Sequence, residues 1–125
     1  MTATKPDAEL LNQPMEQPAQ TIVVDLEKLR EYCLSASHPR GRHKARVFRS
    51  RLGITQADAE LVRQALLDAA QLHHRDLHPT VHDRYGQRYV LDFEMTTSTG
   101  SAVVRSSWIV RNGDDVLRFI TCYVL

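Results

Sequence analysis

Apolar residues recur with a helical period over three segments between residues 26 and 72. We expect helices over residues 26–34, 42–53 and 56–72. The first follows the N-cap Asp25, the second ends at Gly53, and the third begins at a capping box of Thr55 and Asp58. The inward faces predicted for these helices are, in chain order, Leu26, Leu29 and Cys33; Ala45, Phe48 and Leu52; and Ala57, Leu61, Ala65, Leu66 and Ala69.

After His73 the apolar period changes to that of a strand. Strands are expected over residues 77–84, 89–95, 102–111 and 116–124, and the β-branched run over 21–24 fits a short edge strand. Because helices precede strands, the pattern predicts the α+β class: about three N-terminal helices followed by a four-stranded antiparallel meander, with one sheet face covered. The side chains assigned to the core or its borders are Phe48, Leu61, Leu66, Leu91, Phe93, Trp108, Ile109 and Phe119.

The first twenty residues differ in composition from the rest of the chain. Three prolines, Pro6, Pro14 and Pro18, interrupt a stretch in which no apolar period lasts more than a turn. We therefore expect a flexible arm over residues 1–20 and a single α+β domain over residues 21–125. The arm is either a linker without a role or a segment that docks on a partner or in a groove of its own domain.

Length and charge set broad limits on the protein. A chain of 125 residues is long enough to build one core, and its net charge of +1 does not by itself indicate a nucleic-acid binder. Cys33 and Cys122 each lie in an apolar pattern, which predicts buried, reduced thiols. We find no signal-peptide pattern and no apolar run of membrane-spanning length. A cytoplasmic location is expected, reached either directly or by delivery into a target cell without a signal peptide.

The most unusual stretch of the chain runs from Ser37 to Gly53 and carries a dense positive charge. It contains six Lys and Arg side chains and no acidic residue, so its local field is strongly positive. Helical spacing places an exposed basic stripe on one side of the predicted helix, while Lys44 lies at the border of its buried face. The residues predicted to bind nucleic acid are Arg40, Arg42, His43, Arg46 and Arg49. A solvated helix face without a partner is the alternative.

Several kinds of site lack support in the sequence. No Gly-rich phosphate loop, Gly-x-Ser-x-Gly elbow, His-Glu-x-x-His motif or paired-carboxylate arrangement stands out. The histidines His73, His74, His78 and His82 are close in sequence, but their spacing fits no standard zinc site. No cofactor and no metal is therefore expected.

The arrangement of certain residues resembles that of an uncharacterised bacterial domain family. The pattern is His38-Pro39-x-Gly41-x-x-Lys44-Ala45-x-x-Phe48, followed by Leu52-Gly53, Tyr85-Gly86-x-x-Tyr89, Trp108-x-x-x-x-Gly113 and Thr121-x-Tyr123. This resemblance covers the chain from about Val23 to its end and implies a fold without implying a reaction. More loosely, helices followed by a meander resemble the barnase, EndoU and colicin type of toxin ribonuclease, whose members cleave RNA without metal.

The loose resemblance implies a metal-independent ribonuclease that acts by 2′-hydroxyl transesterification. In this hypothesis His38 is the general base or acid, Lys44 and Arg105 stabilise the phosphorane, and Thr121 or Tyr123 positions the phosphate. The main alternative is a module without catalysis that binds an anionic partner through the basic helix. That partner would be nucleic acid or an acidic immunity-type or antitoxin protein. A structural or regulatory domain is the third possibility.

Overall fold

The computed structural model describes residue 19 and residues 21–125. The arm predicted over residues 1–20 therefore lies outside the described residues, apart from Ala19. Ala19 is partly buried and packs against the hydrophobic core. Domain boundaries drawn at this arm stay a prediction.

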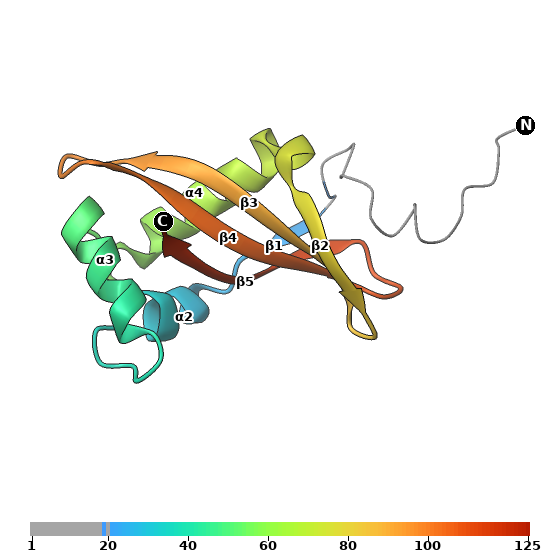
Figure 1. Ribbon diagram of the computed structural model, residues 1–125, viewed down its shortest axis with the longest axis horizontal. Coiled ribbons are helices and arrows are strands. Elements are labelled where there is room, and N and C mark those ends of the chain that lie inside the picture. The colour runs from blue at the N-terminus through green and yellow to red at the C-terminus, as the bar shows by residue number, and fades with distance from the viewer. Residues whose placement is uncertain (1–18, 20) are drawn as a thin grey trace, which may run out of the picture.

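The described chain forms one five-stranded mixed sheet with the strand order β1-β5-β4-β3-β2 (Figure 1). The strands are β1 (Thr21–Val23), β2 (His78–Asp83), β3 (Gly86–Thr96), β4 (Ser101–Arg111) and β5 (Val116–Val124). Neighbouring strands from β2 to β5 are antiparallel, as predicted. β1 pairs in parallel with β5, from Thr21 opposite Val116 to Val23 opposite Arg118.

The α+β class is confirmed, but the prediction of a four-stranded antiparallel meander after N-terminal helices is wrong. The run expected as a short edge strand over residues 21–24 forms β1, which precedes all the described helices and occupies the sheet edge beside β5 as a fifth strand. The physical reason is that a β-branched run of three residues can hydrogen-bond to an otherwise open strand edge. Between β1 and β5 the chain passes through the helices and then through β2, β3 and β4, and it returns beside β1 in the same direction, which makes this pair parallel.

The helices lie close to their predicted positions. They are α2 (Leu26–Lys28), which continues as the π-helix η1 (Leu29–Cys33), then α3 (Arg42–Leu52), the 3₁₀ turn η2 (Gln56–Asp58), α4 (Ala59–Leu72) and the 3₁₀ turn η3 (His74–Asp76). The predicted caps are confirmed. Asp25 accepts a hydrogen bond from the Glu27 N–H at 2.9 Å, Thr55 and Asp58 form a capping box, and Gly53 ends α3 with a φ of 65°.

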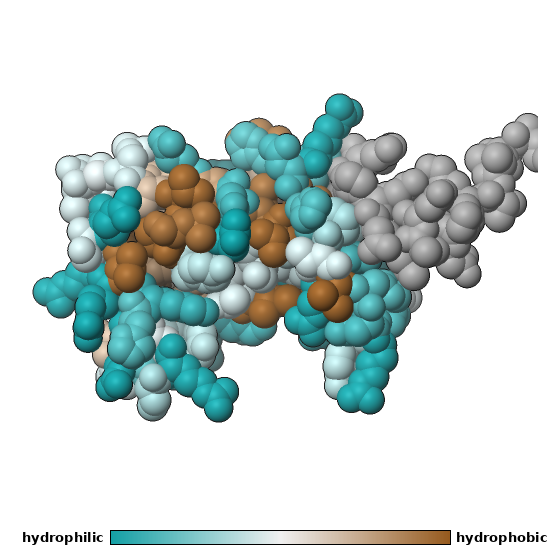
Figure 2. All heavy atoms as spheres, in the orientation of Figure 1, coloured by the Kyte–Doolittle hydropathy of each residue, from teal (hydrophilic) through white to brown (hydrophobic). Residues whose placement is uncertain are grey.

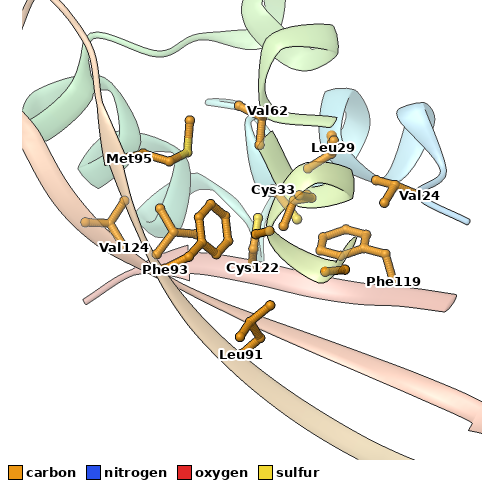
Figure 3. Close-up of a cluster of buried hydrophobic side chains, with 14 of the residues drawn as sticks. Val24, Leu29, Cys33, Val62, Leu91, Phe93, Met95, Phe119, Cys122 and Val124 are labelled. Carbon is orange, nitrogen blue, oxygen red and sulfur yellow. The ribbon is translucent and has the colours of Figure 1, made fainter. Parts of the chain in front are cut away.

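The core lies between the sheet and its helices (Figure 3). Phe48, Leu66, Trp108 and Phe119 are buried as predicted, whereas Leu61 is 54% exposed. Leu61 lies within α4, and the residues that this helix buries, such as Val62 and Leu66, place Leu61 toward the outer side of the helix. The residues that α4 buries are Ala59, Val62, Leu66, Ala69 and Ala70.

The surface of the molecule separates polar and apolar regions (Figure 2). In this view the surface over α3 and the loop before it is mainly hydrophilic, and an apolar patch lies near the C-terminal end of β5. Val103 and Leu125 are exposed there and joined by a backbone hydrogen bond of 2.9 Å. None of the helices within the described part of the chain has the length and apolar character of a membrane span.

Candidate functional site

The turn before α3 fixes the position and the tautomer of His38. Its Nδ1 accepts hydrogen bonds from the backbone N–H groups of Arg40 and Gly41, each at 3.0 Å. A nitrogen that accepts two hydrogen bonds carries no proton, so the neutral ring holds its proton on Nε2. Gly41 is buried against the Tyr32 carbonyl, where a Cβ would collide with the carbonyl oxygen. The turn before α3 therefore packs closely against the end of η1.

Lys44 lies at the centre of a group of rings that we call the Lys44 cluster, formed by Tyr32, His38, Lys44 and Tyr123. The Lys44 Nζ atom is 5.7 Å from the Tyr32 ring centroid and 5.2 Å from the Tyr123 ring centroid. The His38 ring meets the same Tyr32 ring edge-on, with 4.6 Å between centroids. Lys44 is half-buried and has no carboxylate partner among the described residues. Its positive charge is thus stabilised by cation–π contacts with the two tyrosine rings and is not neutralised by a carboxylate, so it can still pair with an anion.

A β-bulge decides that Tyr123 and Thr121 face away from the core. Thr121 pairs with Ser107 and Phe119 pairs with Trp108, so Ile120 has no partner in the ladder. This extra residue reverses the side-chain alternation of β5. Leu117 and Phe119 are buried before the bulge and Cys122 and Val124 after it, while Thr121 and Tyr123 are half-buried. Without the bulge, both hydroxyl side chains would point into the core.

Arg105 connects the Lys44 cluster to the centre of the sheet. Its guanidinium donates two hydrogen bonds to the Asp92 carboxylate, both 2.8 Å long, and Arg105 lies directly opposite Tyr123 in the ladder between β4 and β5. Asp92, Arg105 and Tyr123 are opposite one another on β3, β4 and β5. The hydrogen bonds from Arg105 lower the pKa of Asp92, which keeps this carboxylate ionised. Because the Arg105 charge is already paired with Asp92, Arg105 is a neighbour that can position the Tyr123 side chain and is not a free cation.

Beneath Thr121 lies a pair of thiols. The Thr121 Oγ1 atom is 3.6 Å from the Cys33 Sγ atom, and the Cys33 and Cys122 side chains point toward one another (Figure 3). Both cysteines are buried and free, which confirms the prediction. The neighbouring Cys122 side chain and backbone N–H, and more weakly the Thr121 hydroxyl and the charge of Lys44, lower the pKa of Cys33 to about 6 against the opposing effect of burial. The same pairing raises the pKa of Cys122.

The basic stripe of α3 forms one wall of a cavity of about 510 Å³, which we call the arginine groove. Arg42, Arg46 and Arg49 are exposed on this wall. The floor contains Leu34, Ala45 and Ile54, and the segment over residues 55–57 forms the opposite wall. Arg40 and His43 are exposed but do not line the groove. The five residues predicted to bind nucleic acid are therefore divided between two places.

A second cavity, of about 630 Å³, lies between α4 and β3 and has the opposite charge. Its carboxylates come from Asp68, Asp76, Asp92 and Glu94. Asp92 is already paired with Arg105. Nowhere in residues 19 and 21–125 are three or more His, Cys, Asp or Glu side chains grouped as ligands for a metal ion.

The structure brings the residues proposed as catalytic into one region. His38 and Lys44 share the Tyr32 ring, Lys44 and Arg105 both contact Tyr123, and Thr121 lies two residues away on the same strand. Sequence reasoning missed Tyr32, which contacts two of these residues. A signal was present, because position 32 borders the predicted buried face of Leu29 and Cys33 and lies only six residues before His38.

Comparisons with known proteins give a family and a fold. The model of a family described as a domain of unknown function (DUF6883) matches residues 15–125. One solved structure of the same fold is a contact-dependent growth inhibition toxin–immunity protein complex from Klebsiella pneumoniae 342. A chain of that complex superposes with a TM-score of 0.63 at 19% sequence identity, covering 82% of this chain and 99% of its own length. No curated protein matches the chain.

Proposed function

Because this chain belongs to the DUF6883 family of domains of unknown function and shares its fold with a chain of a toxin–immunity complex, we propose that it is a toxin-like domain that cleaves RNA without a metal. The resemblance to an uncharacterised family is thereby confirmed. The activity itself is our inference from the chemistry of the Lys44 cluster. The site of action would be the cytoplasm of the cell in which the domain is made or into which it is delivered.

The observation that carries this proposal is the state of Lys44. Lys44 is half-buried, and its ammonium contacts two tyrosine rings and no acid among the described residues. Such a charge is arranged before any ligand arrives and is only partly screened by water. It therefore suits a group that gains negative charge during a reaction, as a phosphodiester does when it becomes a phosphorane.

The remaining groups of the cluster support the same reaction with modified roles. In RNA transesterification the 2′-hydroxyl gives its proton to a water molecule as its oxygen attacks phosphorus, and the 5′-oxygen leaves with a proton from water, so that a 2′,3′-cyclic phosphate forms. Because His38 Nδ1 is occupied by two backbone donors, we propose that His38 donates its Nε2–H to a phosphate oxygen instead of acting as the general base. Tyr123 and Thr121, which lie next to the cluster's charge on β5, supply hydroxyl groups, and Arg105 lies opposite Tyr123 on β4. The proposal thus rests mainly on electrostatic stabilisation.

The surroundings of the cluster offer further positive charge to a polyanion. Arg40 and His43 are exposed on either side of Gly41 and Arg42, at the same end of α3 as Lys44. The first turn of α3 contains no acidic residue, so the positive end of the helix dipole adds to this field. We propose that the RNA backbone passes over this end of the helix.

A module that binds an anionic partner without catalysis is the second candidate. The observation in its favour is the arginine groove, which lies apart from the Lys44 cluster and has no acidic residue in its lining. Binding there requires no reaction. The two candidates are separated by whether RNA is cut.

Induced expression tests the proposed activity in cells. Growth should stop on expression of the wild-type chain, with loss of intact RNA, and Lys44→Met should remove the arrest. Met keeps the length and apolar stem of the side chain and removes only the charge. Lys28→Met is the matched control, because Lys28 is exposed and donates to the Phe119 carbonyl outside the cluster. Intact RNA in cells that make folded wild-type protein would reject the ribonuclease.

A further inference from the structure

The arginine groove has a regular construction that the proposed ribonuclease does not use. Its three arginines are four and three residues apart on α3, which places them on one face of the helix. Across the groove, Gln56 is held in place by a hydrogen bond of 2.6 Å from its Nε2 atom to the Arg30 carbonyl. The capping box at Thr55 fixes the start of the same wall. Both walls are therefore ordered by contacts of their own.

The charge of the groove is unbalanced. Elsewhere on the surface Arg63, Arg88, Arg105 and Arg118 each have a carboxylate partner within 4 Å. The three groove arginines have no carboxylate partner among the described residues, a property that they share with Arg51, Arg75 and Arg111 outside the groove. What sets the groove arginines apart is that they lie side by side on one face of α3. Neighbouring like charges repel one another, so an anion that enters the groove relieves this repulsion and gains pairing with planar donors.

The floor of the groove indicates which anion fits. It is apolar, made by Leu34, Ala45 and Ile54, and no residue of the lining is aromatic. Proteins that hold single-stranded nucleic acid usually stack its bases on aromatic rings, which this groove does not offer. A volume of about 510 Å³ accommodates a few side chains and not a folded surface. An aliphatic side chain flanked by carboxylates meets both the floor and the walls.

We propose that the arginine groove is the docking site for an acidic segment of a partner protein, which inserts one aliphatic side chain between flanking Asp or Glu residues. The positive wall pairs with the carboxylates, and the apolar floor receives the aliphatic anchor. This inference stands whether or not the chain cleaves RNA, because the groove and the Lys44 cluster share no lining residue.

The test measures binding of the full-length chain to two fluorescein-labelled peptides by anisotropy. One peptide has the sequence Glu-Asp-Leu-Glu-Asp, and the other has Ser in place of Leu. We expect the Leu peptide to bind more tightly than the Ser peptide, and raised salt to weaken both. The triple variant R42Q/R46Q/R49Q should weaken the Leu peptide by roughly tenfold or more, a factor that corresponds to about 1.4 kcal/mol.

The matched control is R51Q/R75Q/R111Q, which removes the same charge from three exposed arginines outside the groove. It should keep the wild-type affinity, and circular dichroism should show that both triple variants are folded. Equal weakening by the two variants would mean that only net charge matters and would overturn the proposal. Equal affinity for the Leu and Ser peptides would overturn the apolar anchor.

Two other results would show that something else occupies the arginine groove. If labelled tRNA loses more affinity than the peptide in the groove variant, the groove is an RNA site and the proposal fails. If Asp7→Asn/Glu9→Gln in the full chain raises peptide affinity tenfold or more, the chain's own N-terminal segment competes for the groove. A partner protein would then not be its main occupant.

Discussion

The substitution Phe48→Ala tests whether α3 is anchored as the structure indicates. Phe48 is fully buried at the centre of α3, the helix that carries both Lys44 and the arginine groove. Removing a fully buried phenylalanine side chain leaves a cavity and costs about 3 to 5 kcal/mol. A domain of this size has a total stability of about 5 to 15 kcal/mol, so the variant loses a large share of it.

The assay is urea denaturation followed by the fluorescence of Trp108. This is the chain's one tryptophan, and it is fully buried beside Phe119. Val47→Ala is the matched control, because Val47 neighbours Phe48 on the same helix and is 37% exposed. We expect the control to lose less than about 1 kcal/mol. A loss below about 1 kcal/mol for Phe48→Ala itself would remove α3 from the core and refute the reasoning.

Two further predictions concern the end of α3 and the thiol pair. Gly53→Ala should destabilise the domain by roughly 1 to 2 kcal/mol because alanine is strained in the left-handed backbone conformation, and the collision of its Cβ with Thr99 Oγ1 should add to this loss. Adding Thr99→Ala should recover only the part that comes from the collision. An unchanged loss in the double variant would exclude that collision. Because the folded pKa of Cys33 is about 6 and its unfolded value is near 9, the unfolded state binds more protons between these values. The wild type should therefore gain stability relative to Cys33→Ala as pH rises from about 6 to 9, and it should lose this advantage as pH falls through 6. Urea midpoints that show no such difference between the two proteins would contradict the lowered pKa of Cys33.

Much of the fold could be predicted because local signals and burial agree. The period of Ala45, Phe48 and Leu52 matches the buried side of α3, and the last strand has the predicted bounds. The prediction for Leu61 was wrong because Leu61 and Val62 are adjacent apolar residues that each fit a helical period, and the folded structure buries Val62. The sequence did not indicate that β1 pairs in parallel with β5, because this pairing joins segments that are far apart in the chain and leaves no local pattern.

The candidate site shows a similar division. Helical spacing correctly placed Lys44 at the border of the buried face of α3. The sequence could not indicate on which side of the sheet the Thr121 and Tyr123 side chains lie, because the bulge at Ile120 depends on the pairing of β5 with β4. The arginine groove needed its second wall, which begins at Thr55 and becomes a neighbour of α3 only after the chain has folded. The binding and catalytic roles of these residues stay predictions.

The central claim is that the Lys44 cluster cleaves RNA, and cleavage of purified RNA by purified protein tests it most directly. We predict that the wild type cuts RNA in the presence of EDTA, leaves 2′,3′-cyclic phosphate ends and spares DNA. Lys44→Met should cut at least about 100-fold more slowly, the scale expected for one preorganised charge or donor in the transition state. Lys28→Met should cut at the wild-type rate. RNA left intact by folded wild-type protein, or equal rates for Lys44→Met and Lys28→Met, would contradict this account.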